Sequence, residues 1–183
     1  TAKYTAADAV AALADEDNIR PLGDRFAVKG IQVPAARPVG GGDISGGGED
    51  DLLVLIQNHI DNVVNAANPP GGIIILIGSC KEGLGEKCFE RWIQEAMCSH
   101  DLIDRVQTHF ELGGHKAAAI AMVLENARIF LVSEMAPELV RKCFLEPYSS
   151  VQKALDDAFA ILGSNATVLA MPYGGSTLPI VEQ

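Results

Sequence analysis

One short run near the middle of the chain constrains the fold more than any other segment. It starts at Gly71-Gly72, continues through the apolar residues 73–77, and reaches a glycine-containing turn, 78–85, before a helical pattern begins. This order is typical of a buried strand, a turn and a helix in an α/β protein. Open α/β sheets usually hold ligands between a strand's carboxyl end and the first turn of the next helix. We therefore expect a binding site at this turn.

The composition favours a globular domain and argues against several function classes. Apolar residues make up 48% of the 183 residues and charged residues 21%, an ordinary globular balance. The net charge of -10 argues against a nucleic-acid partner, because neutralising phosphates requires clustered Lys and Arg. The longest apolar run, 73–77, is far shorter than the roughly 20 residues that cross a bilayer. We expect a soluble, cytoplasmic protein without nucleic-acid or membrane partners.

Cysteine and histidine spacing gives no sign of a metal site. The chain contains the cysteines Cys80, Cys88, Cys98 and Cys143 and the histidines His59, His100, His109 and His115. The cysteines form no CxxC pair, so reduced thiols are expected rather than a disulfide framework. The histidines do not stand at metal-ligand spacing, so no zinc site is expected.

The first 50 residues are expected to form an irregular extension with a linker. Residues 5–14 predict a short helix, and residues 26–33 predict one edge strand that Gly30 and Pro34 keep short. Six glycines within 40–48 predict a flexible linker.

The remaining residues, 51–183, predict one α/β domain. Apolar spacing predicts helices from Asp50 and over 84–97, 101–110, 114–126, 137–142 and 148–162, with strands over 73–78, 128–133 and 167–171. Strands separated by helices predict parallel pairing with right-handed crossovers. The expected fold is a doubly wound, mostly parallel sheet in a three-layer α/β/α domain.

The turn after the first predicted strand carries three candidate ligand-binding residues, Ser79, Cys80 and Glu82. Its Gly83-Leu84-Gly85 segment lacks the third glycine of a dinucleotide fingerprint and the lysine-serine ending of a phosphate loop. Two interpretations therefore stay open. The turn either lines a ligand or only connects strand and helix, with Cys80 as a packed thiol.

His115 and Lys116 are the stronger candidates. They follow Gly113-Gly114 and open a predicted helix, whose start carries a partial positive charge. An imidazole and an ammonium group there favour an anionic partner such as a carboxylate substrate. The alternative is an ordinary solvated first turn.

Further segments are expected at the same edge of the sheet. Ser133-Glu134 and the tail 171–179 follow the other predicted strands, and the carboxyl ends of parallel strands share one edge. Three loops would then meet at this edge of the sheet. The alternative for the tail is that it only closes the sheet and does not contact a ligand.

Taken together, several motifs resemble the carboxy-terminal domain of the nickel-dependent lactate racemase family. The resemblance spans about 51–183 and rests on Pro70-Gly71-Gly72, Cys80-Lys81-Glu82-Gly83-Leu84-Gly85 with Phe89 and Trp92, Phe110-Glu111-Leu112-Gly113-Gly114-His115-Lys116-Ala117, Leu131-Val132-Ser133-Glu134 and Met171-Pro172-Tyr173-Gly174-Gly175-Ser176-Thr177-Leu178-Pro179.

This resemblance implies two α/β domains around a nickel-pincer nucleotide, which accepts hydride from the α-carbon of a 2-hydroxy acid and returns it to either face. It also implies that the tethering lysine, the nickel-binding histidine and the acid/base histidines belong to an amino-terminal domain. That domain is not recognisable in residues 1–50. The catalytic residues are therefore unknown, no metal ligand is expected in this chain, and the cofactor is not expected to bind this chain alone.

The resemblance also assigns substrate-side residues. The family has a helix bearing Tyr-Gln-x-x-Lys, and here Gln57 matches the glutamine, while no tyrosine or lysine stands at the family positions. This departure leaves the identity of the substrate open. By its place in the Gly-Gly-His-Lys motif, His115 resembles the residue that approaches the cofactor ring.

Two hypotheses follow. In the first, the chain is the substrate-side domain of a lactate-racemase-like enzyme for a small 2-hydroxy acid, and needs a missing amino-terminal domain or a companion chain. In the second, it is a non-catalytic α/β binding or assembly module that uses residues 1–50 to pair with another subunit, and a homo-oligomer is one form of that pairing.

Overall fold

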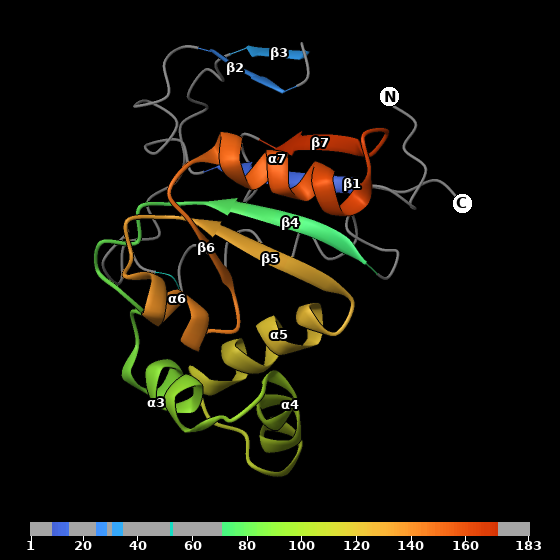
Figure 1. Ribbon diagram of the computed structural model, residues 1–183. Coiled ribbons are helices and arrows are strands. Elements are labelled where there is room, and N and C mark those ends of the chain that lie inside the picture. The colour runs from blue at the N-terminus through green and yellow to red at the C-terminus, as the bar shows by residue number, and fades with distance from the viewer. Residues whose placement is uncertain (1–8, 15–24, 29–30, 35–51, 53–70, 172–183) are drawn as a thin grey trace.

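The computed structural model describes residues 9–14, 25–28, 31–34, 52 and 71–171. Its main sheet has five strands in the order β6-β5-β4-β1-β7 (Figure 1). These strands are β1 (Ala9–Ala14), β4 (Gly72–Ile77), β5 (Ala127–Val132), β6 (Glu146–Tyr148) and β7 (Thr167–Met171). Every neighbouring pair is parallel, so the predicted parallel α/β sheet is confirmed.

Helices cover both faces of this sheet. They are α3 (Lys87–Glu95), α4 (Ser99–Thr108), α5 (Gly114–Leu124), α6 (Pro137–Lys142) and α7 (Val151–Leu162). Strand β4 is buried along its whole length. Ile74 and Leu76 pack in the core with α3 to α6, whereas Ile73 and Ile75 pack in a second core with α7. Alternate β4 side chains thus point into opposite layers, as the three-layer prediction requires.

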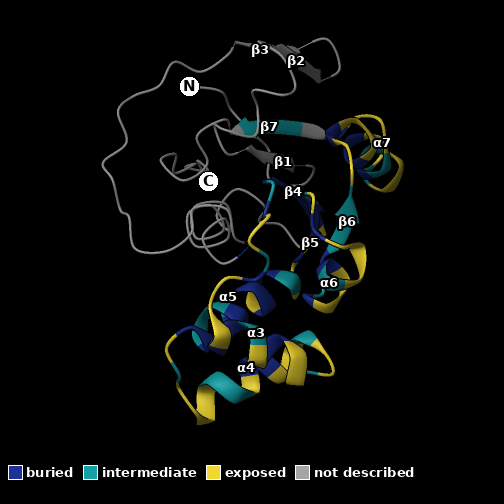
Figure 2. Cartoon of the chain, turned by 90° about the vertical axis from the view of Figure 1, so that its left-hand side faces the viewer, coloured by how far each residue is buried: buried dark blue, intermediate teal, exposed yellow. Residues whose placement is uncertain are grey.

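Local sequence signals set several helix ends where they were expected. Pro137 occupies the first turn of α6, and Gly163, with φ +92°, ends α7. Helix α3 begins at Lys87, later than expected, because the Glu86 side chain caps it by accepting from the amides of Cys88 and Phe89. The outer sides of α3 and α4 carry mostly exposed residues (Figure 2).

The predicted helix over 5–14 is wrong for the part that the structure describes. Residues 9–14 form β1, which pairs with β4 on one side and β7 on the other, with Val10 opposite both Ile73 and Val168. Backbone ladders on both sides outweigh the helix preference of this alanine-rich segment, and neither partner strand is near it in sequence.

Three further strands depart from expectation. The single strand expected over 26–33 is two strands, β2 (Arg25–Val28) and β3 (Ile31–Pro34), paired antiparallel in a separate two-stranded sheet. Strand β6 was not predicted, and Tyr148 belongs to it rather than opening α7. Strand β6 has only three residues, one of them Pro147, so its sequence pattern is too short to predict a strand. Proline is tolerated there because β6 lies at the edge of the sheet.

The predicted helix from Asp50 and the linker over 40–48 lie outside the described residues, except Leu52. Leu52 is fully buried, and its amide donates a 2.9 Å hydrogen bond to the Gly83 carbonyl in the β4–α3 turn. The domain boundary near residue 50 stays a prediction. Among the described residues, no helix is long and apolar enough to span a membrane.

Candidate functional site

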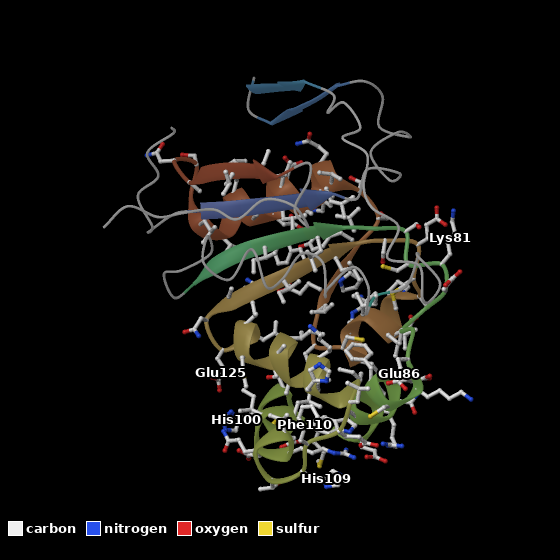
Figure 3. The ribbon with its side chains drawn as sticks, turned by 180° about the vertical axis from the view of Figure 1, so that it is seen from behind. Lys81, Glu86, His100, His109, Phe110 and Glu125 are labelled. Carbon is white, nitrogen blue, oxygen red and sulfur yellow. The ribbon has the colours of Figure 1, made fainter. Side chains whose placement is uncertain are left out.

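The loops after β4, β5 and β6 are joined at the carboxyl edge of the sheet. The Glu134 amide donates to the Ser79 carbonyl at 3.0 Å, and the Ser133 amide donates to the Tyr148 carbonyl at 3.2 Å. An exposed ion pair, Lys81 with Glu134 at 3.7 Å, spans the first two loops; Figure 3 labels Lys81 at this edge. The structure therefore brings Ser79 and Glu134 together, while the tail from 172 onward lies outside the described residues.

The turn 79–85 is anchored in the core at two points. Cys80 is 2% exposed and adopts φ +50°, and Leu84 is also buried. The Gly83 amide donates to the Cys80 carbonyl at 3.1 Å and closes the turn. Ser79 is half-buried, whereas Glu82 is exposed. Cys80 thus sits in the hydrophobic core as a packed thiol would, and the polar surface of the turn comes from its neighbours.

The start of α5 lies directly beside the start of α3. We call residues 113–116 the Gly-Gly-His-Lys corner. A Cβ added at Gly113 would stand 2.1 Å from Oε2 of Glu86, the residue that follows the 79–85 turn and caps α3. The glycine turn and the corner are therefore adjacent, since only the lack of a side chain at Gly113 lets Glu86 approach this closely. Figure 3 labels Glu86 at this junction.

Gly114 brings α5 against a buried tryptophan. A Cβ at Gly114 would stand 2.2 Å from Cε2 of Trp92, which is fully buried on α3. The indole Nε1 donates a 2.8 Å hydrogen bond to Oε2 of Glu111. The corner is thus seated on the Trp92 ring, and Glu111 satisfies the buried indole N–H.

The pKa of Glu111 is shifted more strongly than that of any other group in this region. Its carboxylate also accepts a hydrogen bond from the Arg91 guanidinium. Arg91 and then Trp92 lower the pKa of Glu111 to about 2. Burial, followed by the Glu111 carboxylate, raises the pKa of the Cys88 thiol, which is therefore protonated at neutral pH. Sequence reasoning did not predict a role for Arg91, and it noted Trp92 and Glu111 only as members of motifs. Glu111 pairs with two residues about twenty positions earlier in the chain, and a local pattern does not register such contacts.

The depressed pKa of Glu111 predicts an acid-labile contribution to stability. A carboxyl whose folded pKa lies below its unfolded value stabilises the protein above the unfolded pKa, and this contribution disappears as pH falls through the folded value. We expect the free energy of unfolding to fall between about pH 4.5 and pH 2, and to fall less steeply in Glu111→Gln. Urea unfolding at several pH values measures this; equal slopes in both proteins contradict it.

His115 is held in one hydrogen-bonding form. Its Nδ1 accepts from the Gly113 amide at 3.2 Å, and its ring lies 5.5 Å from the Phe110 ring, centroid to centroid. Because Nδ1 is an acceptor in this contact, the proton of the neutral ring is assigned to Nε2. His115 therefore offers an N–H donor, and the half-buried Lys116 beside it adds a cation.

The other sequence candidates lie elsewhere or outside the described residues. Gln57 is outside the described residues. His100 contacts Glu125 at 2.8 Å and links α4 to α5, whereas His109 is exposed. Within 71–171 and the other described segments, no group of three His, Cys, Asp or Glu side chains could hold a metal ion.

The residues of this arrangement match a known protein family. The family model described as lactate racemase C-terminal domain matches residues 61–178. The chain belongs to this family. The match covers the β4–α3 turn, the Gly-Gly-His-Lys corner and the loops after β5 and β6, so the candidate site lies within the lactate racemase C-terminal domain.

Individual relatives agree with this family. Lactate racemase from Thermoanaerobacterium thermosaccharolyticum is 25% identical over 118 residues, which are 62% of this chain and 28% of that protein. The solved apoprotein of lactate racemase from the same organism has a TM-score of 0.70 and 19% identity, covering 99% of this chain and 37% of that one. The chain therefore shares the fold of part of that structure and spans little more than a third of its length.

Proposed function

We propose that this chain is the substrate-side domain of a lactate-racemase-like enzyme that racemises or epimerises a small 2-hydroxy acid. The observation that carries the proposal is the Gly-Gly-His-Lys corner, seated beside the 79–85 turn with His115 held as an Nε2–H donor. Family membership supports a racemase, and the corner supports the class of substrate.

The chemistry of a 2-hydroxy acid matches what the corner offers. At neutral pH such a substrate carries a carboxylate, and charge-assisted hydrogen bonds to a carboxylate are stronger than neutral ones. His115 Nε2–H and the Lys116 ammonium group provide two donors at the positive start of α5. Their role in the proposal is to bind and orient the carboxylate, which places the α-carbon for a reaction completed by groups outside this chain.

The nickel-pincer nucleotide implied by the family resemblance would accept and return the α-hydrogen as hydride. The described residues do not fit as the holder of its nickel ion, because they contain no suitable group of three donor side chains. We assign the metal ligands and the acid/base groups to an amino-terminal domain or a companion chain. The part of the reaction assigned to this chain is confined to binding and orienting the substrate.

A second candidate function is a non-catalytic binding or assembly module. It is favoured by two exposed apolar side chains beside the corner, Phe110 at 68% and Leu112 at 79% exposure, since such residues are typical of contact surfaces. Elemental analysis and intact mass of the protein from its native host separate the two functions. A nickel-carrying nucleotide on an associated chain supports the enzyme, and its absence from every associated chain supports the module.

The substrate-side proposal predicts that the purified 183-residue chain neither racemises lactate nor retains nickel. The reason is that the proposed site lacks its hydride-transferring half. Chiral chromatography of D- and L-lactate incubated with the chain, together with elemental analysis after desalting, measures both properties. Turnover by this chain alone would refute the division of labour that we propose.

A further inference from the structure

We propose that Glu111 is a positioning residue that holds the His115 imidazole in its Nε2–H form by tying the start of α5 to α3. This inference rests on the proposed function for its biological meaning, but the geometry that carries it is independent of any substrate. It rests on the contacts of the Glu111 side chain and backbone carbonyl, and on the ring contact of its chain neighbour Phe110 with His115.

The side chain of Glu111 joins the corner to α3. One carboxylate oxygen accepts from Trp92 Nε1 at 2.8 Å, and the other accepts from Arg91. Both donors lie on α3, in consecutive positions. Because Trp92 is fully buried beneath Gly114, the Glu111 carboxylate is attached to a part of the core that cannot move without disturbing the corner.

The backbone of Glu111 reaches His115 directly. Its carbonyl accepts from the His115 amide at 3.2 Å, which places the first turn of α5 relative to the anchored carboxylate. The preceding residue, Phe110, places its ring against the imidazole, with an angle of 35° between the two planes. The same short loop therefore sets both the backbone and one ring face of His115.

The remaining contact of the imidazole depends on the position of Gly113. The Gly113 amide donates to Nδ1 at 3.2 Å, while Glu86 and Cys88 occupy the space that a Cβ at Gly113 would need. If the Glu111 carboxylate no longer binds α3, Gly113 is no longer held against Glu86 and Cys88. Nδ1 of His115 then loses its hydrogen-bond donor. The imidazole then samples both tautomers, as an exposed histidine does.

The tautomer of the neutral His115 ring can be measured in the 183-residue chain without substrate. Long-range nitrogen–carbon correlation NMR reports which ring nitrogen carries the proton, and the signals are assigned by their loss in His115→Ala. We expect the wild type to show the Nε2–H form, with the exposed His109 as an internal reference. In Glu111→Gln we expect the Nε2–H population of the neutral ring to fall and the His115 signals to shift toward those of the exposed His109.

The matched control is Glu146→Gln. Glu146 also pairs with an arginine, Arg128 at 2.7 Å, and is similarly exposed, but the pair joins β6 to β5. This variant should leave the His115 signals unchanged. Unchanged His115 signals in a folded Glu111→Gln protein, or the same shift in Glu146→Gln, overturn the proposal, because a merely structural carboxylate would alter stability without changing the tautomer.

A second variant keeps the test decisive if Glu111→Gln does not fold. Trp92→Phe removes one of the two donors to Glu111 and retains an aromatic ring beneath Gly114. A partial shift of the His115 signals in the same direction supports the proposal, and wild-type signals contradict it. If Glu111 controls the tautomer but the complete enzyme does not act on 2-hydroxy acids, the proposed function fails while this inference stands.

Discussion

Gly114→Ala is expected to lower the free energy of unfolding by about 2–3 kcal/mol, the cost of forcing extra volume into a packed core. The added Cβ would stand 2.2 to 2.6 Å from three ring atoms of Trp92, and that ring is fully buried. Alanine is the better helix former, so propensity alone predicts a gain, smaller than the roughly 1 kcal/mol of a helix interior because Gly114 is the first residue of α5. The sign of the change therefore distinguishes close packing from helix propensity.

Urea unfolding of four proteins tests this prediction: the wild type, Gly114→Ala, Trp92→Leu and the double variant. Leucine lacks the ring atoms that the new methyl group meets. We expect Gly114→Ala to be neutral or stabilising in the Trp92→Leu background, with an interaction energy equal to the removed clash. Additive effects in the double variant, or a stabilised single variant, contradict the close packing of α5 on α3.

His115→Ala and Lys116→Ala are each expected to lower kcat/KM about 10- to 100-fold in the complete protein that contains this chain. The estimate corresponds to the loss of one hydrogen bond to a charged group, about 1.5–3 kcal/mol. If both side chains hold the substrate carboxylate equally in the ground state and the transition state, the loss appears as a raised KM with little change in kcat.

Steady-state kinetics with several 2-hydroxy acids measures this effect, and two substitutions serve as controls. His109→Ala removes an exposed histidine from the C-terminal end of α4, and Lys142→Ala removes an exposed lysine from α6. Neither belongs to the Gly-Gly-His-Lys corner, so both should leave kcat/KM unchanged. Unaltered kinetics in both corner variants would remove His115 and Lys116 from the proposed site.

The Gly-Gly-His-Lys corner shows which features a local sequence pattern can predict. Gly113-Gly114 predicted the start of α5, and the structure begins the helix at Gly114. The pattern did not indicate why two glycines are needed there. That reason lies at the start of α3 and along it, where Glu86 meets Gly113 and Trp92 meets Gly114. A sequence pattern registers only neighbours along the chain, and these contacts join residues more than twenty positions apart.

The prediction of Cys80, Ser79 and Glu82 as candidates shows the same limit. Their place after a buried strand was correctly inferred from the run of isoleucines that forms β4. Which side chain faces the core depends on the positive φ of Cys80 and the packing of Leu84, and both arise from the tertiary fold. The turn is thus placed by sequence, while its exposed surface is decided by packing.

By itself, the amino-acid sequence determined the parallel α/β class, most helices from α3 onward, and the strands β4, β5 and β7. Those features follow from apolar periodicity, caps and terminating residues that act within a few positions. Only the tertiary structure decided that residues 9–14 form a strand between β4 and β7, and that Glu111 joins the start of α5 to Trp92. Both features depend on partners that are distant in the chain. Backbone pairing and burial with those partners outweigh the local conformational preference of each segment.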